Sequence, residues 1–271
     1  MGDMFRYRGV IFDLDGTLYR GEQAIPGAPE TVRCLREAGC RVTFVSNKPL
    51  EPRERYAEKL TGLGIPASPA DVLTSGYVLG RWLAQEVPGA RLYVVGEPPL
   101  VEELRAFGLR PTDGSGPVDF VVAAFDRTFD YAKLNTAFQA LRRGARFVAT
   151  NGDRTCPVEG GEIPDAAAVI GALEGCSGKR PELVAGKPSP MMIEAGLARM
   201  GLRPEECIVV GDRLETDIRM GKEAGTATAL VLTGVTRRED LAGSPWLPDV
   251  VLESVAELTE HVMRDACCVC G

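Results

Sequence analysis

Apolar segments of strand length alternate with helical patterns along this sequence. The strand-like runs begin at Val10, Val42, Cys207 and Thr228, and the helical patterns span residues 29–38, 53–63, 190–200 and 215–224. Strands that alternate with helices in this way are typical of a parallel sheet with helices packed on both faces. The sequence therefore predicts an α/β fold whose core is a doubly wound, Rossmann-like parallel sheet.

A second set of strand and helix patterns interrupts this core. Its strand-like runs cover residues 92–95, 118–125 and 146–150, and its helical patterns lie near 100–107 and 131–143. The interruption is much longer than one crossover connection, so it predicts a separate α/β domain. We place the core in residues 1–76 and 185–271, the inserted cap domain in 77–184, and the hinges near 74–76 and 177–186, where turn residues gather.

Two aspartates, Asp13 and Asp15, follow the first apolar run. Side chains two residues apart on an extended chain point to the same side, so the two carboxylates converge at the end of a buried strand, where open α/β sheets bind ligands. Neighbouring acids raise each other's pKa unless a cation lies between them. The pair predicts either a metal site or one protonated acid, although Asp followed by Gly is also a common turn.

Two later segments offer groups that bind phosphate. Ser46 and Asn47 end the second strand-like run, where a hydroxyl, an amide and backbone N–H groups can hold phosphate oxygens. Read alone, this segment also fits a simple junction between strand and loop. Lys187 lies between a glycine and a proline that opens a helix, and its spacing to earlier glycines does not match a Walker phosphate loop.

Acidic residues also follow the strand-like run that begins at Cys207. Asp212 stands at the end of this run, where a carboxylate is a natural ligand for a hard cation. Asp217 is predicted either to support that metal site or to cap the next helix, and the sequence does not separate the two roles.

In order, these segments resemble the four motifs of the haloacid dehalogenase superfamily of phosphohydrolases. The resemblance covers about residues 9–260 and extends to D-L-D-G-T-L-Y-R-G at 13–21, I-P-G-A at 25–28, A-T-N-G-D at 149–153, G-K-P-S at 186–189 and V-G-D-R-L-E-T-D-I at 210–218. These motifs look like subfamily IIA, whose members carry a large α/β cap. That group includes phosphatases of pyridoxal phosphate, phosphoglycolate, nitrophenyl phosphate and nucleoside monophosphates.

The resemblance implies a mechanism and a role for each site residue. It implies that Asp13 is the nucleophile that becomes an aspartyl phosphate and that Asp15 is the general acid and base. It implies that Ser46, Asn47 and Lys187 bind the phosphoryl oxygens. It also implies that the Asp13 carboxylate, the Asp15 carbonyl and Asp212 bind Mg²⁺. The expected activity is Mg²⁺-dependent hydrolysis of a small phosphate monoester, such as a sugar phosphate, phosphoglycolate, glycerol phosphate or a nucleotide.

The inserted domain departs from these relatives at two places. Cys156 precedes Pro157 where the pyridoxal phosphate relatives carry a histidine, and residues 164–168 read P-D-A-A-A where many relatives have G-x-G. If Arg154, Cys156 and Asp165 face the closed site, they select the leaving group. In the alternative, Cys156 packs and Asp165 caps the Ala-rich helix that follows.

Composition excludes several other function classes. Lys plus Arg is 31 against 38 for Asp plus Glu, and the net charge of -7 argues against a nucleic-acid binder. The single histidine, His261, leaves no residues for a Ser-His-Asp triad, a Cys-His protease or a His-rich zinc site. No apolar run has the form of a signal peptide or the length of a membrane span, so the chain is expected in the cytoplasm.

The remaining expectations concern partners and cysteines. We expect a small-molecule phosphate ester as partner, neither nucleic acid nor membrane, and leave open a homodimer through the cap. The cysteines before the C-terminal tail are expected to remain reduced. The tail cysteines, Cys267, Cys268 and Cys270, favour a frayed end over a metal site or a lipid anchor, because no second ligand cluster exists.

Other functions fit parts of the same pattern. A signalling receiver domain also places acids, a hydroxyl and a lysine around a phosphorylated aspartate, but Asp15 and an insertion of roughly one hundred residues oppose that interpretation. A phosphotransferase of the same superfamily differs only in what attacks the phosphoenzyme, so the sequence leaves it open. A dehalogenase, in which Asp13 attacks carbon, does not need the metal-binding pattern.

Overall fold

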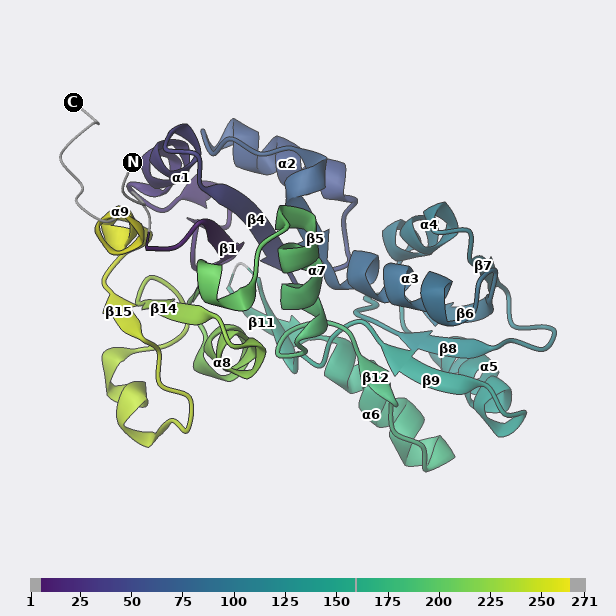
Figure 1. Ribbon diagram of the computed structural model, residues 1–271. Coiled ribbons are helices and arrows are strands. Elements are labelled where there is room, and N and C mark those ends of the chain that lie inside the picture. The colour runs from purple at the N-terminus through teal and green to yellow at the C-terminus, as the bar shows by residue number, and fades with distance from the viewer. Residues whose placement is uncertain (1–5, 159, 264–271) are drawn as a thin grey trace. The chain divides into compact units, whose positions relative to one another are not determined.

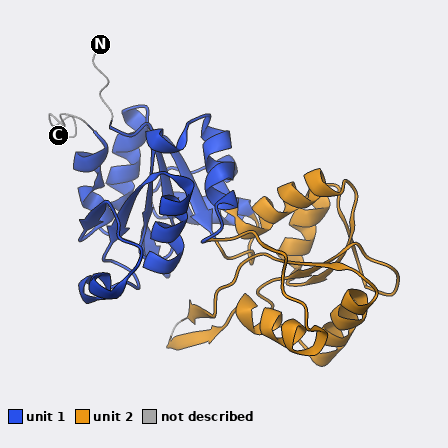
Figure 2. Ribbon diagram, turned by 60° about the horizontal axis from the view of Figure 1, so that its bottom comes forward, with its two compact units in different colours: residues 1–46, 53–73, 188–271 blue, residues 47–52, 74–187 orange. Residues whose placement is uncertain are grey.

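The computed structural model describes residues 6–158 and 160–263, and these form two compact units (Figures 1 and 2). The core unit takes in the described residues of 1–46, 53–73 and 188–271, and the inserted unit those of 47–52 and 74–187. The inserted unit is thus larger than the predicted cap domain, because residues 47–52, 74–76 and 185–187, the last with Lys187, also belong to it. Cys267, Cys268 and Cys270 lie outside the described residues, so the structure does not bear on the tail.

The core unit is built on a six-stranded sheet with the order β15-β14-β13-β1-β4-β5. The strands are β1 (Gly9–Asp13), β4 (Arg41–Ser46), β5 (Val72–Thr74), β13 (Cys207–Gly211), β14 (Ala227–Val231) and β15 (Val250–Leu252). The pairs β4 with β1, β1 with β13, β13 with β14 and β14 with β15 are all parallel. This confirms the predicted α/β class with a parallel, Rossmann-like core.

Strand β1 is buried on both faces because helices cover the sheet from both sides (Figure 1). Val10 and Phe12 belong to one apolar cluster, together with Val32 of helix α1. Ile11 points the other way, where its side chain lies 3.2 Å from the position of a Cβ on Gly196 in helix α7. Successive side chains of β1 therefore pack against the helices on opposite faces of the sheet. This explains why every residue of the strand before Asp13 is apolar.

The helices of the core unit mostly follow the sequence patterns. They are α1 (Ala28–Glu37), α2 (Arg53–Gly62), α7 (Met191–Met200), α8 (Arg219–Ala224) and α9 (Leu258–Val262). Gly201 and Gly225 end α7 and α8 with left-handed backbones, as expected for C-caps. The predicted helix at 215–224 is different: its first turn is a π-helical turn, Leu214–Ile218, and α8 follows it.

The described residues of the core unit also form shorter elements. They are the hairpin of β2 (Tyr19–Arg20) and β3 (Gln23–Ala24) and four 3₁₀ turns, Pro69–Asp71, Pro204–Glu206, Arg238–Gly243 and Val255–Glu257.

The inserted unit has its own parallel sheet, with the order β12-β9-β8-β6-β7. The strands are β6 (Arg91–Val95), β7 (Arg110–Thr112), β8 (Phe120–Ala123), β9 (Arg146–Ala149) and β12 (Leu183–Val184), and the helices are α3 (Ser75–Glu86), α4 (Pro98–Ala106), α5 (Tyr131–Arg142) and α6 (Ala166–Ser177). Strands β10 (Thr155–Val158) and β11 (Gly161–Pro164) form a separate antiparallel hairpin.

The predicted hinge at residues 74–76 lies where the chain passes from the core unit to the inserted unit, but these residues begin a helix and do not form a turn. Ser75 and Gly76 are the first residues of α3, and the Thr74 side chain caps this helix by accepting a hydrogen bond from Tyr77 N at 3.1 Å. The Thr-Ser-Gly sequence is typical of a turn, but Thr is also a preferred N-cap residue. Within residues 6–158 and 160–263, no helix is long and apolar enough to cross a membrane.

A buried ion cluster ties α1, α7 and the turn before β5 together. Asp71 is 6% exposed and accepts hydrogen bonds from Ser68 N and Ser68 Oγ, both at 2.8 Å, and from Arg36 at 2.9 Å. Arg199 of α7 bonds to its other oxygen. Burial disfavours the charged carboxylate, but the Ser68 hydrogen bonds and the two guanidinium groups outweigh it and hold the pKa of Asp71 below its ordinary value.

We expect Asp71→Ala to lower the free energy of unfolding by about 3 kcal/mol, because it leaves two partly buried guanidinium groups without their carboxylate. Denaturant unfolding measures this change, and Glu58→Ala is the control, since Glu58 pairs with Arg55 on an exposed helix surface. A folded pKa below 3.8 means that the stabilisation is complete above about pH 4 and is lost as the pH falls through the folded pKa. Equal losses in both variants, or an equal acid dependence in Asp71→Ala and the parent, would contradict this role.

Candidate active site

The carboxyl ends of β1, β4 and β13 lie side by side at one edge of the core sheet. Asp13 is the last residue of β1, Ser46 is the last residue of β4, and Asp212 directly follows β13. Because these strands are parallel neighbours, their polar ends share one edge. In the register of β1 and β4, Asp13 is opposite Val45, so Ser46 stands one residue further along the neighbouring strand.

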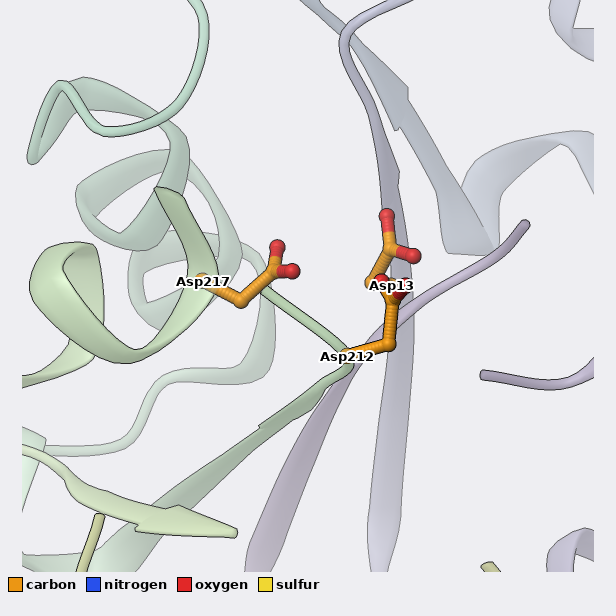
Figure 3. Close-up of side chains that lie close together, drawn as sticks. All are labelled: Asp13, Asp212 and Asp217. Carbon is orange, nitrogen blue, oxygen red and sulfur yellow. The ribbon is translucent and has the colours of Figure 1, made fainter. Parts of the chain in front are cut away.

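Three buried carboxylates converge at this edge (Figure 3). Asp13, Asp212 and Asp217 each offer one oxygen, and the three oxygens lie within 4.8 Å of one another. The residues are only 8%, 1% and 1% exposed. Three negative charges this close repel one another strongly, and oxygen ligands in this arrangement suit a hard divalent cation. The donor set therefore fits the Mg²⁺ that the sequence motifs imply.

A loop after β14 holds Asp212 in place. Val235 N donates to Asp212 Oδ2 at 2.6 Å, and Thr236 N donates to the Asp212 carbonyl at 3.2 Å. A Cβ on Gly234 would lie 1.8 Å from Asp212 Oδ2, so this position requires glycine. Thr233 Oγ1 donates to the Gly16 carbonyl at 2.7 Å and thereby joins the loop to the turn after β1. The sequence analysis missed this loop, although a Thr-Gly pair after a core strand was a usable signal.

Asp217 lies in the acidic cluster and is not the N-cap of α8, which is Ile218, so the predicted capping of that helix is wrong and support of a metal site stays a prediction. Its carboxylate belongs to the acidic cluster, and its Oδ2 also accepts a hydrogen bond from Arg213 N at 3.2 Å. The π-helical turn brings Asp217 against Gly211, where an added Cβ would lie 2.3 Å from the Cβ of Asp217. Single π-helical turns occur often at functional sites, because the extra residue redirects a side chain.

The turn after β1 places further groups near Asp13. Thr17 is fully buried and its Oγ1 donates to Asp13 Oδ2 at 3.4 Å. Asp15 is partly buried, and its backbone forms an isolated β-bridge with that of Tyr19. Burial raises the pKa of Tyr19, and the nearby Tyr56, Asp15 and Asp13 raise it further. The Tyr19 hydroxyl, which sequence analysis did not single out, therefore stays neutral.

Asn47 and Lys187 come together within the inserted unit. The Asn47 side chain accepts a hydrogen bond from Lys187 N at 2.7 Å and donates one to Lys187 O at 3.1 Å. Both residues are buried, with exposures of 8% for Asn47 and 6% for Lys187. The structure thus pairs two of the residues to which the sequence assigned phosphate binding.

The three residues singled out in the cap differ in their surroundings. Cys156 is buried in β10, and Arg154 is exposed. Asp165 is the N-cap of α6: its carboxylate accepts from Ala166 N and also from Asn151 Nδ2 at 3.0 Å. Burial raises the pKa of Asp165, while these hydrogen bonds oppose the rise. The capping contact is present, and a contact of any of the three with substrate stays a prediction.

Two family models match this chain. Residues 10–110 match a model described as haloacid dehalogenase-like hydrolase, and residues 184–258 match one described as HAD-hydrolase-like. Together these ranges contain the acidic cluster, Ser46 and Lys187. The inserted unit between them is spanned by the whole-chain comparisons that follow.

Whole-chain relatives are named as phosphatases. The sugar-phosphatase AraL of Bacillus subtilis is 40% identical, over 93% of this chain and 92% of that protein. The crystal structure of a 4-nitrophenylphosphatase from Thermotoga maritima has a TM-score of 0.90 at 34% identity, covering 94% of this chain and 97% of the other. A glycerol phosphate phosphatase from Mycobacterium tuberculosis in complex with magnesium has a TM-score of 0.87 at 35% identity, covering 93% and 76%. The same M. tuberculosis protein is also known in complex with calcium.

Proposed function

This chain belongs to the haloacid dehalogenase-like hydrolases and is a phosphatase, and we propose that it hydrolyses small phosphate monoesters through an aspartyl phosphate on Asp13. The observation that carries the proposal is the buried cluster of Asp13, Asp212 and Asp217 at the carboxyl edge of the core sheet. Phosphate monoester hydrolysis is among the slowest uncatalysed reactions, with enzymatic accelerations of up to ~10²¹. A nucleophile already desolvated and aligned at a strand end reduces that barrier.

In the first step, an Asp13 oxygen attacks phosphorus and the bond from phosphorus to the leaving oxygen breaks. Asp15 donates its proton to that oxygen, so the product alcohol leaves neutral. In the second step, Asp15 takes a proton from water, the water oxygen attacks phosphorus, and the bond from phosphorus to the Asp13 oxygen breaks. Inorganic phosphate is released, and Asp13 is again a carboxylate.

The phosphoryl oxygens are bound by Ser46, by the segment at Asn47 that follows it, and by Lys187. Their hydroxyl, N–H and ammonium groups stabilise the charge that develops on the transferring group. Lys187 contributes a full positive charge in a chain whose net charge is -7. The Thr17 hydroxyl, which donates to Asp13 Oδ2, orients the nucleophile.

The proposed cofactor is Mg²⁺, held by the Asp13 carboxylate, the Asp15 carbonyl and Asp212, with Asp217 beside them in the same cluster. When bound, the ion supplies neutralisation of the acidic cluster and of the phosphoryl charge. The carboxylates fit such an ion because they are buried, close together and offer oxygen ligands.

The proposed substrate is a small-molecule ester, with its leaving group recognised by the inserted unit acting as a cap. The relatives named above act on different esters, so the choice between sugar, glycerol, phosphoglycolate and nucleotide phosphates is left to experiment. Transfer to an alcohol instead of water is the alternative within the family. A non-enzymatic receiver module is no longer supported, because the relatives are enzymes. A cytoplasmic location and a homodimer through the cap are part of the proposal.

A substrate panel tests the proposed function. Phosphate release is measured with Mg²⁺ and sugar phosphates, phosphoglycolate, glycerol phosphate, pyridoxal phosphate and nucleoside monophosphates, each with the parent and with Asp13→Ala. A preferred small ester that is hydrolysed by the parent and not by the variant supports the proposal. Equal release by both proteins would overturn it, and phosphate transfer to an added alcohol without net hydrolysis would favour the phosphotransferase.

We expect Asp212→Ala to raise the Mg²⁺ concentration needed for half-maximal activity by about 100-fold or more, since loss of even an outer partner of a metal ligand costs about 10- to 100-fold. Titration of activity with Mg²⁺ and calorimetric titration of Mg²⁺ binding measure the change. Glu215→Ala is the control, because Glu215 is an exposed acid in the π-helical turn that follows Asp212. If Asp212→Ala and the control require the same Mg²⁺ concentration, Asp212 is not a ligand.

A further inference from the structure

The Asn47 side chain is fully engaged in protein contacts. Its Oδ1 accepts from Lys187 N at 2.7 Å, and its Nδ2 donates to Lys187 O at 3.1 Å and to Asp153 Oδ2 at 2.8 Å. A carboxamide nitrogen has two hydrogens, and both have an acceptor here. The amide would have to give up one of these bonds to contact a phosphoryl oxygen, so direct binding of substrate is a poor explanation for this side chain.

The two hydrogen bonds from the Asn47 side chain engage both polar groups of the Lys187 backbone. They join its N–H and its carbonyl to one planar amide, in the way that a neighbouring strand would pair with it. Residues 47 and 187 are 140 positions apart in sequence, and the bonds are buried. Ser75 Oγ adds a bond of 2.6 Å to the Asn47 carbonyl, so the segment that carries Asn47 is itself fixed to the start of α3.

Gly186 allows this close approach. Its N–H donates to Thr150 O at 2.6 Å, and a Cβ at this position would lie 2.6 Å from Asn47 Oδ1 and 2.7 Å from Thr150 O. Any side chain here would push the Lys187 loop away from Asn47. The glycine before Lys187 is therefore explained by packing against Asn47 and Thr150.

Asp153, which lies in the loop after strand β9, completes the support. Its Oδ2 accepts from Asn47 Nδ2 at 2.8 Å and from Asn151 Nδ2 at 2.9 Å. Asn151 is 1% exposed and also donates to Asp165, the cap of α6. A hydrogen-bonded chain thus runs from the Lys187 backbone through Asn47, Asp153 and Asn151 to the start of α6.

We propose that Asn47 and Asp153 are positioning residues that fix the backbone of Lys187, and that the Asn47 side chain does not itself bind substrate. The proposal rests on the function proposed above for the Lys187 ammonium. That ammonium is a point charge at the end of a flexible four-carbon stem, so a fixed backbone limits where it can lie. Misplacement of a charged group by 1 Å can cost about 10²-fold in rate.

Hydrogen exchange at the Lys187 amide tests the support without reference to activity. In Asn47→Ala this amide loses its acceptor, so we expect its exchange to accelerate by about tenfold or more. Asn135→Ala is the matched control, since Asn135 is an exposed residue of α5 in the same unit and its side chain accepts a hydrogen bond from Gln139 on the same helix. Unchanged exchange at Lys187 in Asn47→Ala overturns the proposal.

A double-mutant cycle then separates positioning from direct binding. We expect Asn47→Ala to lower kcat/KM on the order of ten- to hundredfold, but to cost less than about threefold more once Lys187→Ala is present. Independent, multiplicative losses would show that Asn47 contacts substrate and would overturn the proposal. If Lys187→Ala alone keeps the parent kcat/KM, the function assigned to Lys187 fails, while the exchange experiment still decides whether Asn47 fixes its backbone.

Exchange of the two partners provides a rescue. Asn47→Asp alone places two carboxylates in contact with each other, so kcat/KM should fall at least as far as in Asn47→Ala. Adding Asp153→Asn restores a donor and an acceptor between positions 47 and 153, with the direction of that bond reversed, while the bonds to Lys187 O and from Asn151 Nδ2 stay lost, so the rescue is partial. We expect the pair to recover kcat/KM by about tenfold over Asn47→Asp. Circular dichroism checks that Asn47→Asp and the double variant are both folded. If both are folded and kcat/KM does not recover in the double variant, the role of Asp153 is contradicted.

Discussion

Replacing Asp13 with asparagine is expected to abolish phosphatase turnover, with a loss of at least about 10⁴-fold in kcat. The amide has the shape of the carboxylate but is a poor nucleophile for phosphorus. Asp13 is the acid of the cluster that ends the central strand β1, and Thr17 orients it. Phosphate release is measured at saturating Mg²⁺, and acid-quenched protein is assayed for covalently bound phosphate, which should appear in the parent alone.

The fold should survive this substitution, because it removes one of three mutually repelling charges. Without metal, we expect Asp13→Asn to melt at the same temperature as the parent or above it. Asp240→Asn is the control, since Asp240 lies in an exposed 3₁₀ turn, and its turnover should match the parent. Residual turnover by Asp13→Asn within about 100-fold of the parent would exclude the covalent role.

Local patterns in the sequence were sufficient for four of the six core strands, β1, β4, β13 and β14, and for the acids at their ends, but not for the short edge strands β5 and β15. The run of Val10, Ile11 and Phe12 predicts a strand buried on both faces, and the parallel order then brings Asp13 and Asp212 to one edge. Both inferences need only side-chain periodicity and the rule that parallel strands share a carboxyl edge.

Contacts between segments that are distant in sequence could not be predicted from local patterns. Val235 N reaches Asp212 only because β14 pairs with β13, and the Asn47 amide holds a residue 140 positions away. Each of these contacts depends on a strand order or a loop path that no local pattern encodes. The π-helical turn is similar: the helical pattern at 215–224 predicted a continuous helix, whereas the turn places the Asp217 carboxylate within hydrogen-bond distance of Arg213 N and beside Asp13 and Asp212.

Replacing Asp15 with asparagine is expected to lower steady-state turnover on the order of 10² to 10⁴-fold, the usual contribution of a general acid and base. The burial of the two acids favours this division of roles, because Asp13 is buried in the acidic cluster while Asp15 is partly exposed. The acid that exchanges protons with water and the leaving group needs that access.

The leaving group makes the Asp15 prediction specific. With 4-nitrophenyl phosphate the leaving phenolate needs little protonation, so the first step should stay fast while water attack on the aspartyl phosphate slows. Rapid mixing should therefore show a burst of nitrophenolate close to one equivalent of Asp15→Asn enzyme, followed by slow turnover. With an alkyl phosphate both steps need the proton transfer, so no burst should appear. Glu22→Gln, which changes an exposed acid of the same turn region, controls for the loss of charge. A steady rate equal to that of the parent with both substrates would mean that another group moves the proton.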